Sequence, residues 1–282
     1  MSEARKYREI YREIYKSSGN FSAEEADAEI DFVMEMLTDE KAYNIWLFDK
    51  ASTNSLHKAQ KIFTQRVKTM KPLQHIVGKA FFRGEKYLVD ENTLIPRPET
   101  EFLVRECIKK VTENTKMILD IGTGSGCIAI ELAKALKTAE ITAVDISEKA
   151  LAVARSNARL HKVSDRVKFL QSDIFENISD TFDIIVSNPP YIDFADKNEV
   201  QKDVFDFEPH SALFADENGC YFYRKIIEES GKFLNKNGLI AFEIGRKQAE
   251  KVSQLLSCNG FVNISVTKDL DGLDRVVSAL KK

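Results

Sequence analysis

The chain has 282 residues, of which 43% are hydrophobic and 30% are charged, and its formal net charge is -3 at pH 7. This length predicts one enzyme-sized core with a smaller module, and the composition is typical of a globular protein. No apolar run approaches the roughly 18 residues that a membrane-spanning helix needs, and the slightly acidic balance disfavours a nucleic-acid partner. The charged N-terminus does not resemble a signal peptide, so we expect a cytoplasmic protein.

Residues 1–72 are expected to form a small helical bundle. Apolar residues recur there at intervals of three and four, as in Tyr7, Ile10, Tyr11 and Ile14, and strand-like alternation is absent. Ser22 precedes two glutamates and is well placed to cap a helix. This part also holds the most basic stretch, which is either a solvated helix face or a surface for an acidic partner: Lys58, Lys61, Arg66, Lys68 and Lys71.

The sequence changes character at Pro72. Residues 73–95 combine β-type residues with glycines and predict a β-hairpin that links two domains. From Lys116 onward, short apolar runs alternate with amphipathic segments, which indicates a parallel sheet with helices on both faces in a domain covering 96–282. Strands are expected at 117–121, 141–144, 167–170, 182–186, 239–244, 262–266 and 275–280, and helices from Pro98 and at 127–136, 150–160, 221–234 and 246–256.

Cysteine and histidine residues give no sign of a disulfide or a metal site. The four cysteines are far apart in the sequence, and the four histidines lack the spacing of metal ligands. We therefore expect neither feature. The cysteines are Cys107, Cys127, Cys220 and Cys258.

A glycine-rich turn follows the first predicted strand of the sheet. It consists of Gly122, Thr123, Gly124, Ser125 and Gly126. Glycines at this point let the backbone turn sharply and let a ligand approach closely. Asp145 closes the next strand, where a carboxylate can accept hydrogen bonds from two ribose hydroxyls. The glycine spacing fits a nicotinamide dinucleotide poorly. The pattern predicts a nucleoside site, with a tight turn and no ligand as the alternative.

Two further aspartates accompany this predicted site. Asp120 directly precedes the glycines and could hold the amino group of a methionine moiety, or it could only cap nearby amides. Asp173 follows the third strand, where it could accept from an adenine amino group while an apolar neighbour, Ile174, covers the ring. A local turn cap is the alternative for Asp173. Together with Asp145 they predict contacts to methionine, ribose and adenine.

The most specific signal is the segment Asn188-Pro189-Pro190-Tyr191 at the end of the fourth strand. Two consecutive prolines lack amide donors and fix their φ angles, so the carbonyls around them are free to accept hydrogen bonds. An amide nitrogen is a poor nucleophile, so catalysis must hold its two hydrogens and aim its lone pair at the methyl carbon. Asn188 Oδ1 and the Pro189 carbonyl can each accept one hydrogen, and Tyr191 can stack on the substrate. A methyltransferase acting on a planar nitrogen is predicted, with a structural Asn-Pro turn as the alternative.

These segments resemble the PrmC/HemK family, the protein-(glutamine-N5) methyltransferases that modify class I peptide chain release factors. The Asn-Pro-Pro-Tyr segment is shared with adenine-specific DNA methyltransferases, and the segment from Arg97 to Glu101 narrows the resemblance to this family. The resemblance covers nearly the whole chain through the segments 72–78, 94–101, 122–127, 187–192, 208–209, 243–245 and 274–277.

The resemblance implies an α/β fold: a Rossmann-like class I methyltransferase with a doubly wound sheet of seven strands, the last one antiparallel, and a small N-terminal helical bundle that helps to grip the substrate. It implies S-adenosyl-L-methionine as cofactor and the glutamine of a Gly-Gly-Gln motif as substrate. Implied cofactor contacts are Asp120, Gly122, Thr123, Gly124, Ser125, Gly126, Asp145, Ile146, Asp173, Ile174 and Asn188. Implied contacts to the glutamine are Arg97, Asn188, Pro189, Pro190 and Tyr191.

Three alternatives stay open. An adenine-specific nucleic-acid methyltransferase would flip its base into the same pocket and stack it on Tyr191. A methyltransferase for a glutamine of a ribosomal protein would use the same chemistry. A nucleotide-binding module without catalysis would bind the cofactor and form no product. We expect a monomer that modifies class I release factors and has no direct contact with nucleic acid or membrane.

Overall fold

The computed structural model describes residues 2–113 and 115–282. The chain forms two compact units. Unit 1 contains Met1–Lys79 and Lys202–Phe207, and unit 2 contains Ala80–Gln201 and Glu208–Lys282. The ranges predicted from the sequence, 1–72, 73–95 and 96–282, are contiguous, whereas unit 1 includes a short segment from the third of them.

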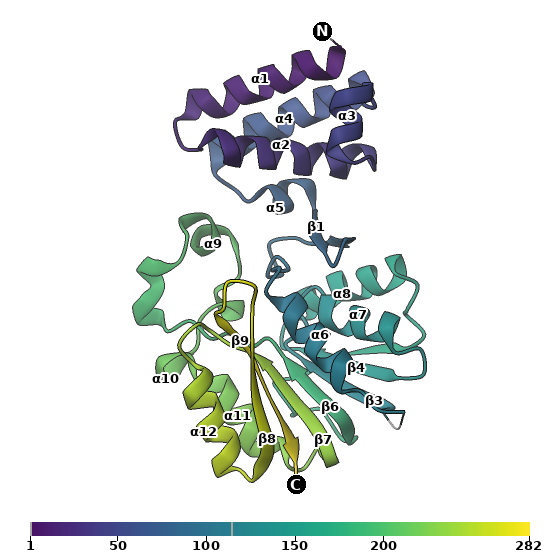
Figure 1. The fold of residues 1–282 in the computed structure, drawn as a ribbon, viewed down its shortest axis with the longest axis vertical. Coiled ribbons are helices and arrows are strands. Elements are labelled where there is room, and N and C mark those ends of the chain that lie inside the picture. Colours follow the sequence, from purple (N-terminus) through teal and green to yellow (C-terminus); the bar gives the residue numbers. More distant parts are fainter. Residues whose placement is uncertain (1, 114) are drawn as a thin grey trace. The chain divides into compact units, whose positions relative to one another are not determined.

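Unit 1 is a helical bundle (Figure 1). Its core is built around Tyr11 and Phe63, whose ring centroids lie 4.7 Å apart, and the Tyr11 hydroxyl donates to the carbonyl of Leu56 at 2.7 Å. The predicted cap is confirmed, because Ser22 Oγ accepts from the amide of Glu25 and the Glu25 carboxylate accepts from the amide of Ser22. The helices are α1 (Glu3–Ser18), α2 (Ala23–Thr38), α3 (Ala42–Phe48), α4 (Thr53–Thr69), α5 (Leu73–Val77) and α9 (Lys202–Phe207).

The basic stretch on α4 does not form one uniform face. Lys58, Lys61 and Lys68 are exposed, but the Arg66 side chain is buried. Arg66 Nη2 lies 2.9 Å from a carboxylate oxygen of Glu29 and 3.6 Å from one of Asp203 in α9. Arg66 is therefore a structural part of unit 1, and the two alternatives, a solvated face or a surface for an acidic partner, apply only to its lysine neighbours.

A β-hairpin is formed by β1 (Lys79–Phe82) and β2 (Glu85–Leu88), and unit 2 begins at Ala80, the second residue of β1. The first strand starts later than the β-type residues suggested, because residues 73–77 form α5 and Gly78 ends that helix with a φ of 74°. The turn between the strands has positive φ at both Arg83 and Gly84, as a two-residue hairpin loop requires. The Tyr87 hydroxyl donates to Glu131 at 2.8 Å and so attaches the hairpin to α7 (Cys127–Ala135).

The main sheet of unit 2 has seven strands in the order β5-β4-β3-β6-β7-β9-β8. The pairs among β3 to β7 are parallel, and β9 runs antiparallel between β7 and β8. The predicted doubly wound sheet with an antiparallel last strand is thereby confirmed. The strands are β3 (Met117–Ile121), β4 (Glu140–Asp145), β5 (Val167–Gln171), β6 (Phe182–Ser187), β7 (Leu234–Glu243), β8 (Phe261–Lys268) and β9 (Asp274–Lys281).

Helices cover both faces of this sheet (Figure 1). Neighbouring strand residues point to opposite faces, so Ile118 packs with α6, α7 and α8, whereas Leu119 packs with α11 and α12. Two separate apolar layers result, and the carboxyl ends of β3 to β6 are held between them. The remaining elements are α6 (Thr100–Lys110), α8 (Glu148–Leu160), η1 (Phe194–Glu199), η2 (His210–Ala212), α10 (Asp216–Gly219), α11 (Tyr221–Ser230) and α12 (Ala249–Cys258).

Some element boundaries differ from the prediction. The helix expected over 221–234 ends at Ser230, because Leu234 begins β7 and pairs with Phe182 of β6. The helix expected from Pro98 begins at Thr100, after a turn in which the Thr100 amide donates to the Arg97 carbonyl at 3.1 Å. Within the described residues, no helix is long and apolar enough to cross a membrane, and no cluster of His, Cys, Asp or Glu could hold a metal ion. All four cysteines are free.

Candidate active site

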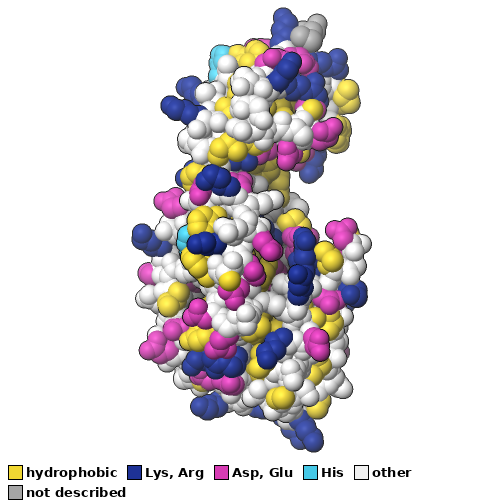
Figure 2. All heavy atoms as spheres, turned by 90° about the vertical axis from the view of Figure 1, so that its left-hand side faces the viewer, with side chains coloured by type: hydrophobic (Ala, Val, Ile, Leu, Met, Phe, Trp, Pro, Cys, Tyr) yellow, Lys and Arg dark blue, Asp and Glu magenta, His cyan; other side chains and the backbone are white. Residues whose placement is uncertain are grey.

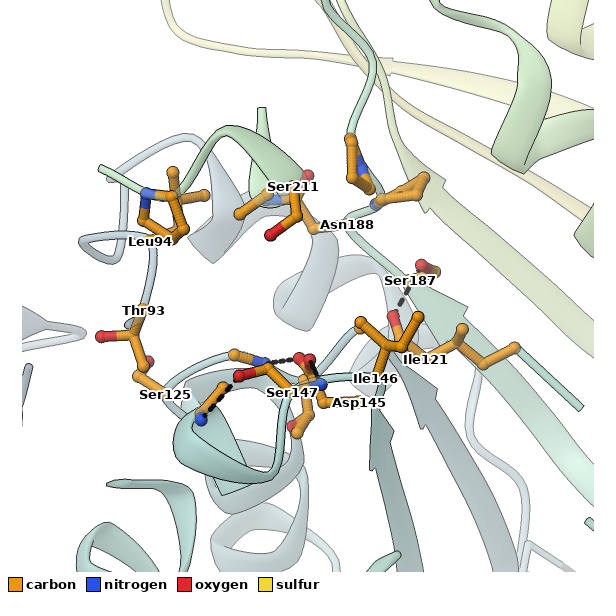
Figure 3. Close-up of a pocket in the computed structure, with 18 of the residues that line it drawn as sticks. Thr93, Leu94, Ile121, Ser125, Asp145, Ile146, Ser147, Ser187, Asn188 and Ser211 are labelled. Carbon is orange, nitrogen blue, oxygen red and sulfur yellow. Dashed lines mark hydrogen bonds between the residues drawn. The ribbon is translucent and has the colours of Figure 1, made fainter. Parts of the chain in front are cut away.

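A cavity opens in unit 2 at the carboxyl ends of the parallel strands, the place where ligands bind in doubly wound sheets. Figure 3 shows Asp145, Ile146 and Ser147 on one side of it and Leu94, Asn188 and Ser211 on the opposite side. The cavity brings together most of the predicted site residues: Arg97, Gly122, Thr123, Gly124, Ser125, Asp145, Ile146, Asp173, Ile174, Asn188, Pro189 and Pro190.

The glycines of the turn after β3 serve two different purposes. Gly122 and Gly124 have φ values of 71° and 54°, and a Cβ added to either would meet no atom within 4 Å. Their backbone therefore borders open space that a ligand could occupy. Gly126 has a φ of 82°, and a Cβ there would lie 3.0 Å from the Cβ of Ala154. Gly126 does not line the cavity, and its small size allows α7 to approach α8.

Asp145 is fixed by the backbone at the end of β4. Its Oδ2 accepts from the amide of Gly124 and its Oδ1 from the amide of Ser147, both at 2.9 Å (Figure 3). Burial raises the pKa of Asp145, while the amide hydrogen bonds favour the ionised form. Each carboxylate oxygen keeps a further acceptor site, so the pair suits two neighbouring hydroxyls of a ribose.

Asp120 lies apart from the cavity surface. Its side chain is buried, it accepts from the Thr123 hydroxyl at 2.6 Å, and burial raises its pKa to about 7. Thr123 lines the cavity and Asp120 does not. The observed role of Asp120 is to hold the glycine turn, and direct contact with a methionine amino group stays a prediction.

The loop after β5 contains an unusual backbone conformation. Ile174 has a φ of 48°, in the left-handed region that a β-branched residue rarely adopts. Ser172 helps to maintain it, since its hydroxyl donates to the Ile174 carbonyl at 3.2 Å and accepts from the amide of Asn177 at 3.0 Å. Such strain costs about 1–3 kcal/mol and tends to occur where a ligand binds. This backbone conformation holds Ile174 and the exposed Asp173 at the cavity. Ile146, which is 60% exposed, lines the same cavity.

Asn188 follows β6 at the opposite side of the cavity. The strand end is tied to β3 by Ser187, whose buried hydroxyl donates to the Ile121 carbonyl at 2.7 Å. Asn188 Nδ2 donates to Thr100 Oγ1 at 3.2 Å. With the nitrogen engaged in this way, the side chain has Oδ1 to offer a substrate. Pro189 and Pro190 continue the cavity wall without backbone donors.

Tyr191 does not line the cavity. Its carbonyl accepts from Gln248 Nε2 at 2.9 Å, and its ring lies close to Gly245, where an added Cβ would come within 3.3 Å of Cδ2. Burial raises the pKa of its hydroxyl well above the usual value. Stacking of Tyr191 on a substrate stays a prediction.

Arg97 lines the cavity and is held by a residue that the sequence patterns did not single out. Its Nη2 donates to Glu208 Oε1 at 2.5 Å, and Glu208 Oε2 accepts from the amide of Ile95 at 2.9 Å. The Glu208 side chain is fully buried, so this pair fixes the segment around Arg97 firmly. The signal available in the sequence was the segment Glu208-Pro209, which belongs to the resemblance.

Glu243 is a second residue that the motifs did not place in the site. It ends β7, is buried, and lies beside Thr100 and Asn188. Burial and the charge of Glu99 raise its pKa to about 7, and Arg275 opposes this shift. Among the described residues, its Oε2 has no hydrogen-bond partner. A carboxyl group with a pKa of about 7 thus lies behind the predicted substrate end of the cavity.

Comparison with known proteins identifies the family. The methyltransferase small domain model matches residues 98–207. A release factor glutamine methyltransferase of Flavobacterium psychrophilum is 46% identical over 222 residues, covering 75% of this chain and 76% of the relative. One from Streptococcus pneumoniae is 48% identical over 191 residues, covering 68% of each. A bifunctional methyltransferase of Rickettsia felis is 40% identical over 247 residues, covering 77% of this chain and 47% of the relative.

Solved structures with low sequence identity support the fold. A ribosomal protein L11 methylase from Lactobacillus delbrueckii aligns with a TM-score of 0.51 at 21% identity, covering 69% of this chain and 84% of that chain. A methyltransferase from Pyrococcus furiosus aligns with a TM-score of 0.54 at 19% identity, covering 71% and 90%. The chain has a methyltransferase fold, a cavity at the strand ends and extended sequence identity to named relatives. It therefore belongs to the family of release factor glutamine methyltransferases.

Proposed function

We propose that this chain transfers the methyl group of S-adenosyl-L-methionine to the side-chain amide nitrogen, N5, of the glutamine in the Gly-Gly-Gln motif of class I peptide chain release factors. One observation carries the proposal. Asn188 stands at the end of a buried strand, its amide nitrogen is engaged by Thr100, and it shares a cavity with the glycine turn and Asp145. A nucleoside cofactor and a planar amide would therefore meet in one space.

The residues at one end of the cavity fit the cofactor. Asp145 suits the ribose hydroxyls, the open backbone at Gly122 and Gly124 suits the methionine portion, and Ile146 and Ile174 offer apolar contacts for adenine. When bound, S-adenosyl-L-methionine supplies an electrophilic methyl carbon. The carboxylate and the apolar side chains come from successive strand ends, in the arrangement that this fold uses for nucleosides.

At the other end, the residues fit an amide nitrogen. Asn188 Oδ1 and the Pro189 carbonyl would each accept one N–H of the glutamine, which turns the nitrogen lone pair toward the methyl carbon. Transfer forms the new N–C bond and breaks the S–C bond of the cofactor. The nitrogen then releases one proton to water, which leaves N5-methylglutamine and S-adenosyl-L-homocysteine. Since a methylated cationic amide is strongly acidic, no general base is needed.

Unit 1 is the proposed substrate-recognition domain, with residues 1–72 as its body and 73–95 as the linker to the catalytic domain. On the face drawn in Figure 2, basic and acidic side chains are interspersed without a large region of one sign. Such a face suits a protein partner better than the continuous negative charge of nucleic acid. Cytoplasmic location and a monomeric state stay predictions.

The test is incubation with methyl-labelled S-adenosylmethionine and, separately, a class I release factor, a ribosomal protein fraction and duplex DNA, followed by peptide mass mapping. We expect label on the glutamine of the Gly-Gly-Gln peptide. Label on a ribosomal-protein glutamine, or only on DNA adenine, would retain the chemistry and reject the proposed substrate. Cofactor binding without product on any substrate would reject catalysis.

A further inference from the structure

The side chains behind Asn188 determine which end of its amide faces the cavity. An asparagine amide has two ends of similar shape and opposite hydrogen-bonding character, so its orientation must be set by its surroundings. Here Asn188 Nδ2 lies 3.2 Å from Thr100 Oγ1, and the Thr100 side chain is buried. Glu243, buried at the end of β7, follows Phe242, the strand partner of Ser187, and so lies next to Asn188; Thr100 is near enough to lower its pKa. Thr100, Asn188 and Glu243 come from three segments that are far apart in sequence.

A hydroxyl group donates one hydrogen and accepts others. If the Thr100 hydroxyl gives its hydrogen to the Glu243 carboxylate, its oxygen must act as acceptor toward Asn188. The amide nitrogen then faces Thr100, and Oδ1 is available to the substrate. If Glu243 carries a proton, the carboxyl group can donate to Thr100, and Thr100 can donate to Asn188. That reversed chain favours the flipped amide, which would present N–H groups to the N–H groups of a glutamine.

Resting on the proposed function, we infer that Thr100 and the ionised Glu243 are positioning residues for methyl transfer, which hold Asn188 with Oδ1 toward the amide of the substrate. Neither residue needs to touch the methyl group. Their contribution is to make one orientation of Asn188 dominant before the substrate arrives, so that no reorientation is needed during the reaction.

The electrostatic surroundings make Glu243 sensitive to pH. Burial and the charge of Glu99 raise its pKa to about 7, while the charge of Arg275 and the neighbouring polar groups of Thr100 and Asn188 favour the ionised form. Glu243 would therefore be about half protonated near pH 7, and the reversed chain would become more populated as the pH falls. The other titratable groups that interact with Glu243 are Tyr191, Tyr223 and Cys127, all of which burial keeps protonated in this range.

The first experiment replaces the hydroxyl of Thr100. Thr100→Val keeps the shape of the side chain but cannot bridge Asn188 and Glu243, so we expect kcat on a Gly-Gly-Gln substrate to fall about ten-fold, the effect of one lost hydrogen bond. The affinity for S-adenosylmethionine, measured by calorimetry, should change less than about two-fold. Thr100→Ser should restore most of the lost rate, because serine retains the hydroxyl.

A matched control is Thr142→Val, which removes the hydroxyl of a buried threonine on β4 that does not line the cavity. We expect it to leave kcat unchanged. If Thr100→Val retains the wild-type kcat, or if Thr100→Ser is as slow as Thr100→Val, the positioning role is wrong. If the wild-type protein does not methylate the glutamine at all, the proposed function fails, and this result is separate from a failure of the positioning role.

The pH profile provides the second measurement. Wild-type kcat should decline as the pH falls below about 7, because protonated Glu243 no longer fixes the direction of the Thr100 hydroxyl. Glu243→Gln should lower the rate about ten-fold and remove this decline, since glutamine does not titrate. Circular dichroism and cofactor affinity would show that the variant is folded. An acid decline that persists unchanged in Glu243→Gln would overturn the role of Glu243.

Discussion

The two ends of the cavity are held in place in different ways. At the proposed cofactor end, backbone groups fix a side chain: the amides of Gly124 and Ser147 hold Asp145, and these two residues follow the adjacent strands β3 and β4. At the proposed substrate end, side chains fix side chains: Thr100 holds Asn188, and Glu208 holds Arg97. The first arrangement tolerates changes in side chains around it, whereas the second depends on the identity of each partner.

The largest effect is expected from Asn188→Ala. This change removes the acceptor proposed to orient the substrate nitrogen, and the loss of one preorganised polar contact typically lowers a rate by at least about 10²-fold. Single-turnover kinetics with a Gly-Gly-Gln substrate would measure it, while calorimetry should find most of the cofactor affinity intact. A near-normal rate would mean that Asn188 does not orient the substrate nitrogen. The proposed difference between the two ends of the cavity would then also be wrong.

A smaller effect, on binding, is expected from Asp145→Ala. The variant loses the charged acceptor proposed for the ribose, so the Kd for S-adenosylmethionine should rise about 10- to 100-fold. The exposed Asp180→Ala serves as a control for the loss of one negative charge. Equal affinities of the Asp145 variant and the wild-type protein, measured by calorimetry, would mean that the ribose lies elsewhere.

The smallest effect is expected from glycine substitutions that test the backbone argument. Gly124→Ala should lower the free energy of unfolding by about 1–2 kcal/mol, because alanine is strained at a φ of 54° although its Cβ meets nothing within 4 Å. Gly126→Ala should cost more, since its Cβ would also press against Ala154.

Gly19→Ala is the matched control for these two changes. Gly19 has a φ of 68° with open space around it and lies at the end of α1, outside the cavity. Denaturant unfolding of the three variants should separate strain from steric contact. If Gly126→Ala is no worse than Gly124→Ala, the close approach of α7 and α8 does not explain the glycine.

This contrast also explains which parts could be predicted from the sequence. The glycine turn and the Asn188 segment each follow a strand directly, and Asp145 is the last residue of a strand, so local patterns located them. The alternation of apolar runs predicted the doubly wound sheet for the same reason. Glu208 and Glu243 belong to segments of the family resemblance, but no local pattern assigned either of them a role in the site. The role of Glu208 comes from its hydrogen bond to Arg97, which is distant in sequence.

Tyr191 shows the opposite limit. Its position beside Asn188 in sequence suggests that its ring stacks on the substrate, and this stays a prediction. In the structure Tyr191 does not line the cavity, and its ring lies close to Gly245. Sequence proximity thus identified the segment and could not assign each side chain in it to the cavity. Asp120 is similar, since it directly precedes the glycine turn yet supports that turn through Thr123.

The assignment of α9 to unit 1 has a consequence for dissecting the protein. The chain passes between the units at residues 79–80, 201–202 and 207–208, so no single cut separates them. Deleting residues 1–79 would leave α9 without the rest of unit 1. Asp203 of α9 would then lose Arg66, its ion-pair partner on α4. A free-standing catalytic fragment would therefore need a redesigned 202–207 loop, and exchange of the bundle between relatives would have to transfer this short internal segment together with the N-terminus.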